Sequence, residues 1–323
     1  NLPAVELDLE DGSTIVAGGN EDRTLIALAQ YSADGGRSWF KDYDPGGWCR
    51  TRSCQLLADG GFLVLGTMSG VGGDVNYKED VMLLRTDNGG NQIWLQTYGT
   101  PGPNSDTGIA AVPTPDGFIV IASSLATGQL VYDAVALVIN QDGSLSRTTS
   151  IGRETEKPET PLIATVTGAG TIVVLGQAGY YYSEGSYHDN FPFLVEVAVD
   201  GSVLWYQSYQ DGDESIITQD SPYALLRTSD GGNLVAGLTT VHGTDVAQTY
   251  FAKYDLLGDP VWYQTLANLT APYSITPTPQ GGYAAIGNVP STDGATYDIF
   301  LVVLGADGKL FIRGNAGYRV GIH

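Results

Sequence analysis

The side chains best suited to binding gather in one tyrosine-rich segment. Four tyrosines and a histidine lie close together, and a second histidine follows later: Tyr180, Tyr181, Tyr182, Tyr187, His188 and His242. Exposed tyrosines give a large contact area at a small entropic cost, so the segment predicts stacking on a glycan or contact with a protein. The alternative is that the rings cover a junction between structural units. The two histidines, with Asp189 and Asp245 close in sequence, also have the ligand types that bind a transition metal.

Three aspartates occupy one place in a repeating pattern, each ten residues before a recurrent glycine: Asp80, Asp133 and Asp298. A residue fixed in a repeat is typical of an architectural role, in which its carboxylate bonds to the backbone where a strand begins. Carboxylates are also the ligands that Ca²⁺ prefers, and Asp74, Glu79 or Asp293 could assist them. Calcium is therefore a possible cofactor, and the sequence indicates no other with certainty.

The chain has two cysteines, Cys49 and Cys54. In an oxidising compartment this pair predicts a local disulfide. Free thiols, or a bond between subunits, are the alternatives. Two cysteines at this spacing do not make a zinc site by themselves.

Catalytic signatures are scarce. The sequence contains no Gly-x-Ser-x-Gly elbow, no His-Glu-x-x-His run and no phosphate-binding loop, and its arginines are scattered. With 36 acidic residues, a carboxylate pair for glycoside hydrolysis remains open. We therefore predict that the protein is not an enzyme, and a secreted glycoside hydrolase is the less favoured hypothesis.

The elements that must position these side chains are six copies of one pattern. Each copy has an Asp-Gly-Gly-like turn, two apolar runs, a glycine turn and a final run that often carries tryptophan. The closing turns centre on Gly36, Gly90, Gly143, Gly201, Gly258 and Gly308. Each copy holds four short apolar runs and no 3.6-residue period, which indicates strands rather than helices.

Four strands in each repeat of this length are typical of a β-propeller blade. The predicted fold class is all-β, a six-bladed β-propeller of four-stranded antiparallel blades in a single domain. The expected blades cover approximately residues 1–46, 47–102, 103–155, 156–211, 212–269 and 270–323.

The first copy has a sharper signature at residues 32–39, Ser-Ala-Asp-Gly-Gly-Arg-Ser-Trp, which fits the Asp-box pattern. We expect Asp34 to bond to the turn backbone, Gly36 to supply a positive φ and Trp39 to pack between blades. The whole chain resembles the repeats of secreted bacterial and archaeal β-propellers, with close matches at residues 59–67 and 80–87. The resemblance implies the architecture and says little about function, because such propellers have many roles.

The composition limits the classes of partner that we expect the protein to bind. The formal net charge is −21, so nucleic acid and anionic membrane surfaces are disfavoured. No long apolar run predicts a membrane span, and no signal peptide is present, so a secreted protein would be in its mature form. We expect an extracellular or cell-surface location.

The favoured function is a non-enzymatic extracellular scaffold or adhesion protein that associates with itself into a filament or surface layer. The reason is that several predicted outer strands are aromatic and uncharged: Ile93 to Tyr98, Val203 to Tyr209 and Val261 to Leu266. Strand edges without lysine invite strand addition. The alternative is a propeller module that binds a cell-surface glycan or protein through the tyrosine-rich loops.

Overall fold

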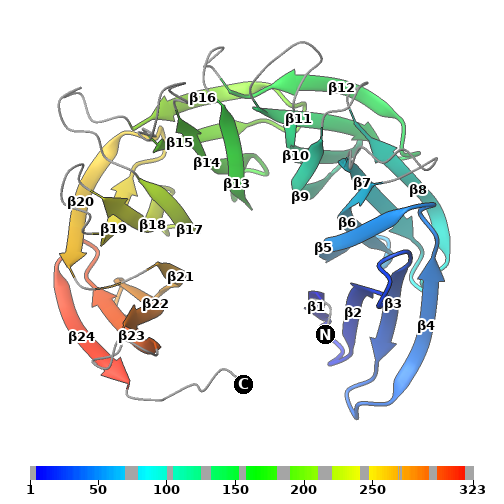
Figure 1. Cartoon of the computed structure of the whole chain (residues 1–323), viewed down its shortest axis with the longest axis horizontal. Helices are drawn as coiled ribbons and strands as arrows, with labels where there is room; N and C mark the ends of the chain where they lie inside the picture. The colour runs from blue at the N-terminus through cyan, green and yellow to red at the C-terminus, as the bar shows by residue number, and fades with distance from the viewer. Residues whose placement is uncertain are drawn as a thin grey trace. The chain divides into compact units, whose positions relative to one another are not determined.

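The structure is a computed structural model, and it describes residues 5–69, 79–99, 105–124, 132–152, 158–179, 190–209, 220–240, 247–267, 269, 271–290 and 297–316. Within these residues the chain forms six four-stranded antiparallel sheets and no helix (Figure 1). We call the sheets blades 1 to 6 and the strands of each blade A to D. In every blade the strands pair in chain order, with A at one edge and D at the other. No helix long and apolar enough to cross a membrane occurs in the described residues.

The chain divides into two compact units, of which the first is Asn1–Gly152 with Val199–Ser202. Its blade 1 has β1 (Val5–Asp8), β2 (Thr14–Gly19), β3 (Ile26–Tyr31) and β4 (Arg37–Tyr43). Blade 2 has β5 (Trp48–Leu56), β6 (Phe62–Ser69), β7 (Glu79–Thr86) and β8 (Gln92–Tyr98). Blade 3 has β9 (Asp106–Thr114), β10 (Gly117–Ser124), β11 (Asp133–Asn140) and β12 (Leu145–Ser150).

The second unit is Arg153–Ala198 with Val203–His323. Its blade 4 has β13 (Glu159–Val166), β14 (Ile172–Gly179), β15 (Asn190–Val197) and β16 (Val203–Ser208). Blade 5 has β17 (Ser221–Arg227), β18 (Asn233–Thr240), β19 (Ala247–Tyr254) and β20 (Pro260–Ala267). Blade 6 has β21 (Pro272–Pro277), β22 (Tyr283–Pro290), β23 (Tyr297–Leu304) and β24 (Leu310–Ala316).

Each blade has two ends with different chemistry. The A–B and C–D turns lie at one end, which we call the turn end. Strands A and C begin at the opposite end, which we call the loop end. Within each unit the A strands of successive blades lie next to each other, β1 by β5 and β5 by β9 in the first, β13 by β17 and β17 by β21 in the second. The B and C strands of blades 2 to 5 are mostly buried, because apolar residues on both faces pack against neighbouring blades.

The first C–D turn is held by a short polar network. Oδ1 of Asp34 accepts hydrogen bonds from the backbone N–H of Gly36 at 3.1 Å and from Oγ of Ser32 at 2.6 Å. The residue with a left-handed backbone is Gly35, with a φ of 83°, rather than the predicted Gly36. In the other five blades the left-handed residue is the predicted turn glycine, as Gly143 is in blade 3, so the predicted position is one residue late in blade 1 alone.

D-strand tryptophans join successive blades. A Cβ added at Gly90 would lie 2.7 Å from the Trp39 ring, and one added at Gly143 would lie 3.0 Å from Trp94. The ring of one blade therefore packs on the turn glycine of the next, which must lack a side chain. Trp205 with Gly258 and Trp262 with Gly308 repeat this contact in the second unit.

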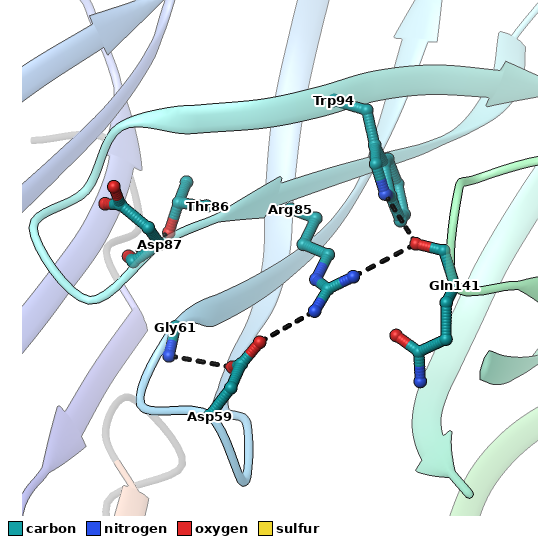
Figure 2. Close-up of polar contacts among 7 residues, drawn as sticks. All are labelled: Asp59, Gly61, Arg85, Thr86, Asp87, Trp94 and Gln141. Atoms are coloured by element: carbon teal, nitrogen blue, oxygen red, sulfur yellow. Dashed lines mark hydrogen bonds and ion pairs between the residues drawn. The ribbon is translucent and has the colours of Figure 1, made fainter. Parts of the chain in front are cut away.

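Blade 3 has Arg147 where blades 1, 2, 4 and 5 have tryptophan. Its guanidinium donates to the backbone oxygen of Asp200 in the next C–D turn and lies 3.9 Å from that residue's carboxylate. In blade 2 the Trp94 indole N–H donates to the Gln141 carbonyl of the next turn at 3.0 Å (Figure 2). The arginine thus replaces the indole donor with a charged one.

A cation on strand C strengthens the turn end of blade 2. Arg85 forms an ion pair with Asp59 at 2.7 Å and donates to the Gln141 carbonyl at 3.0 Å (Figure 2). Lys253 and Asp230 form the equivalent pair in blade 5. Because one cation contacts its own A–B turn and a neighbouring C–D turn, it couples folding of adjacent blades.

Both cysteines lie on β5, and both are buried free thiols, so the predicted disulfide is wrong. Five residues of extended strand separate their Cα atoms by about 16 Å, whereas a disulfide needs less than about 7 Å. Both side chains belong to the apolar core between blades 1 and 2. Burial raises the pKa of the Cys49 thiol to about 11 and that of Cys54 to about 12, which keeps both protonated and unreactive.

Candidate functional site

Three buried carboxylates mark the loop end where strand A begins in successive blades. Asp106 is 3% exposed, Glu159 is fully buried and Asp220 is 9% exposed. In each of these blades a small residue of strand B, alanine or glycine, pairs with the strand A residue that comes two positions after the acid. In blade 3, for example, Ala122 pairs with Gly108, and Asp106 is two residues before Gly108. Acidic side chains are rarely buried to this degree, so the repeated placement indicates a purpose beyond solubility.

In the first unit, Asp106 faces a second carboxylate from blade 2. A methyl group added at Gly99 would overlap Oδ1 of Asp80 and lie 3.2 Å from Oδ2 of Asp106. The backbone N–H of Glu79 also donates to Oγ of Ser105 at 3.2 Å, which ties the start of β7 to the start of β9. The two aspartates are thus side by side, and Asp80 is the partly exposed member of the pair.

Asp133 lies two strands away from Asp106 within blade 3. Ser124 on β10 pairs with Asp106 on one side and with Asp133 on the other. Strands are 4.7–4.9 Å apart, so the Cα atoms of the two aspartates are separated by about 10 Å. Residues in register across strands project from the same face of the sheet, so both carboxyl groups face blade 2.

Partial burial raises the pKa of Asp133. Its side chain is half-buried, and this loss of water raises its pKa above the ordinary value of 3.8. Oγ of Ser150 donates a hydrogen bond of 2.6 Å to Oδ2 of Asp133, which opposes the rise. A partly exposed aspartic acid with a raised pKa is suited to donate a proton.

In the second unit, Glu159 and Asp220 have aromatic surroundings. Glu159 accepts a hydrogen bond from the Tyr206 hydroxyl, and the Tyr206 ring stacks on Phe193 with centroids 5.5 Å apart. Asp220 is held through its backbone, whose carbonyl accepts from the Gln177 amide at 3.0 Å. Tyr250, which is 1% exposed, has its pKa raised well above 10 by burial, with Asp220 among the charges that contribute.

Only some of the predicted binding residues lie within the described part of the chain. Tyr180, Tyr181, Tyr182, Tyr187, His188 and His242 lie outside the described residues. Of the predicted calcium ligands, Asp80 and Asp133 lie in the first unit, and Asp298 begins the equivalent strand in blade 6. No group of three His, Cys, Asp or Glu side chains that could hold a metal ion occurs among the described residues.

Sequence reasoning missed Asp106, Glu159 and Asp220. The available signal was positional, since all three occupy one register of the repeat at the start of strand A, where blade 2 has the apolar Cys49. An acid that a repeat places at an apolar position is the feature to look for in such chains.

Comparisons with known proteins found neighbours in structure only. No family model matches the chain, and no curated protein matches it. An α-L-arabinofuranosidase of Fusarium graminearum, solved with an iminosugar inhibitor, has a TM-score of 0.53 at 16% identity, covering 94% of this chain and 92% of that one. An α-L-arabinanase of Penicillium chrysogenum, complexed with arabinobiose, has a TM-score of 0.51 at 13% identity, covering 98% and 92%. An ulvan lyase of polysaccharide lyase family 25 has a TM-score of 0.58 at 12% identity, covering 95% and 82%.

The fold is a six-bladed β-propeller. At these identities the likeness shows the fold and does not transfer an activity.

The comparisons correct the functional prediction. The prediction of a non-enzymatic, filament-forming scaffold is wrong, because these neighbours are enzymes that act on carbohydrates. The prediction relied on the outer strand edges and the loops. It overlooked the buried carboxylates, because they lie at the starts of strands and belong to no catalytic sequence motif.

Proposed function

We propose that the protein is a glycoside hydrolase that cleaves a neutral polysaccharide. The observation that carries the proposal is the placement of three aspartates at one loop end, with Asp80 beside Asp106 and a raised pKa at Asp133. Two of the three neighbours above are named for hydrolysis of arabinose-containing substrates, which supports this chemistry. The net charge of −21 favours a neutral substrate over an anionic one, because like charges repel.

In this proposal the two partly exposed aspartates, Asp133 and Asp80, act as the general acid and the general base. Asp133 donates its proton to the glycosidic oxygen as the bond from that oxygen to the anomeric carbon breaks. Asp80 takes a proton from a water molecule, whose oxygen forms the new bond to the same carbon. Asp106, which is buried beside Asp80, is a positioning residue that fixes the orientation of Asp80.

The strand geometry also suggests the stereochemical course. Enzymes that invert the anomeric centre have carboxyl groups about 6.5–9.5 Å apart, which leaves room for the water. Asp80 lies beside Asp106, whose Cα atom is about 10 Å from that of Asp133 across Ser124, so we favour inversion over a covalent intermediate.

The test is a screen of the purified protein for release of reducing ends from linear arabinan, arabinogalactan, xylan and ulvan. We expect cleavage of at least one neutral polymer and none of ulvan, with the inverted anomer as the first product in proton NMR. The Asp133→Asn variant, with unchanged thermal unfolding, should lose this activity. No reducing ends from any neutral polymer, or equal activity of the variant, would overturn the proposal. An extracellular location remains a prediction.

A further inference from the structure

A bulge recurs at one place in strand A. In blades 2 to 6 this strand has one more residue than its B partner, and the extra residues are Arg52, Ile109, Leu162, Tyr223 and Tyr273. A bulge redirects the side chain of the extra residue away from the regular alternation of the strand. Strand A is the free edge of each sheet, so these side chains leave the sheet at that edge.

Blades 5 and 6 both place a tyrosine at the bulge, on strands that lie side by side. Tyr223 on β17 is 44% exposed and Tyr273 on β21 is 60% exposed. Three other rings of blade 5, Tyr250, Phe251 and Tyr254, are buried. Two exposed rings at the same position of adjacent edge strands are the feature to be explained.

The Tyr273 ring is held in place. The side-chain amide of Asn288 donates a hydrogen bond of 2.8 Å to its hydroxyl oxygen. A ring fixed before binding loses little conformational entropy when a ligand arrives. Its hydroxyl retains a proton that it can donate to a ligand.

Polar groups lie on the same strand as the first ring. Asp220 comes directly before β17, and its backbone is fixed by the Gln177 amide. Sugar rings present faces of C–H bonds, which pack on the electron-rich face of an aromatic ring, and hydroxyl groups around the rim, which bond to carboxylates and amides. The two exposed rings, with the Asn288 amide fixed beside Tyr273, match this chemistry.

We propose that Tyr223 and Tyr273 form a stacking platform for successive sugar rings of a neutral polysaccharide. The proposal rests on the proposed function for the class of ligand, but it concerns a binding site in the second unit and not the aspartates of the first. The acidic character of the chain excludes neither sugar stacking nor hydrogen bonding, whereas it opposes an anionic chain.

The test measures binding apart from cleavage. Affinity electrophoresis in gels containing linear arabinan, xylan or ulvan is run with the Asp80→Asn variant, to which Tyr223→Ala or Tyr273→Ala is added. We expect each alanine to weaken binding to the retarding neutral polymer about tenfold, and the Tyr223→Phe change to preserve it. Tyr263→Ala is the matched control, because this tyrosine is 55% exposed on the D strand β20, away from the A edge.

The outcomes separate the two proposals. Unchanged retardation of both alanine variants would overturn the platform, even if the wild-type protein cleaves the polymer. Loss of retardation in both, with Tyr263→Ala unaffected, supports the platform even if no polymer is cleaved. Absence of retardation by every neutral polymer would also overturn it, and an equal loss in the Tyr263→Ala control would show that the effect is not specific to the platform and would overturn it as well.

Discussion

The two ends of the blades use the same residue in opposite electrostatic settings. At the turn end, eight aspartates have pKa values lowered by hydrogen bonds that stabilise the carboxylate: Asp11, Asp34, Asp59, Asp87, Asp142, Asp200, Asp230 and Asp307. At the loop end, desolvation raises the pKa of Asp133, and Asp106 is buried. The turn aspartates are therefore fixed as anions that hold hairpins, whereas Asp133 is placed to exchange a proton. The difference teaches that the position of an acid in the repeat predicts its role better than its presence does.

The largest effect should come from the loop end. Replacing Asp80 with Asn removes the carboxylate that accepts the proton of water, and loss of a general base reduces turnover about 10²–10⁴-fold. The measurement is kcat on the polymer identified in the screen. Thermal unfolding of the variant should match that of the wild-type protein, since the side chain is only partly buried. A variant that keeps its kcat would remove Asp80 from the mechanism.

The turn end should respond in the opposite manner. Trp94 is 8% exposed and packs on Gly143, so Trp94→Ala should lower the free energy of unfolding by about 3–5 kcal/mol. Urea unfolding followed by circular dichroism measures the loss. Activity per folded molecule should stay unchanged at a temperature where the variant is still folded. A specific loss of turnover would show that the two ends are not independent.

A smaller effect is expected at the ion pair of blade 5. The hydrogen bond from Lys253, followed by that from Thr228, lowers the pKa of Asp230 to about 2 from 3.8. A lowered pKa in the folded state stabilises the fold above pH 3.8, and this contribution disappears as the pH falls through about 2. Because the Asp230 side chain is more than half exposed, Asp230→Asn should cost about 1 kcal/mol or less at pH 7.

The check is urea unfolding of both proteins at several pH values. The difference between the wild-type protein and Asp230→Asn should be present at pH 7 and should vanish near pH 2. A difference that does not depend on pH would mean that the ion pair contributes nothing through its charge.

The smallest effect concerns the proton donor. Ser150→Ala removes the hydrogen bond that lowers the pKa of Asp133, so that pKa should rise further. The acid then stays protonated to higher pH, and the alkaline limb of the kcat profile should move upward. A downward shift, or no shift with unchanged kcat, would argue against Asp133 as the acid.

The sequence predicts the fold more fully than the site. Glycine and tryptophan spacing sets the blades because Gly143 must have a left-handed backbone and must leave room for Trp94. The contact between Asp80 and Asp106 depends on how blades 2 and 3 pack, which no local pattern records. The cysteine error has a similar origin, since closeness in sequence is not closeness in space when both residues lie on one strand. The tyrosine-rich segment and its proposed role in binding lie outside the described residues.

The most direct test compares two aspartates that the repeat places at the same position. Asp133 and Asp298 hold the same place near the start of strand C, where they pair with Ser124 and Val289 of strand B. Asp133 has an acid on the far side of strand B, because Ser124 also pairs with Asp106. The measurement is kcat and melting temperature for Asp133→Asn and Asp298→Asn on one neutral polymer. We predict a loss of turnover of about 10²–10⁴-fold for Asp133→Asn alone, with similar melting temperatures for both variants. Equal activity, with equal losses of stability, would show that these aspartates are architectural and would contradict a catalytic loop end.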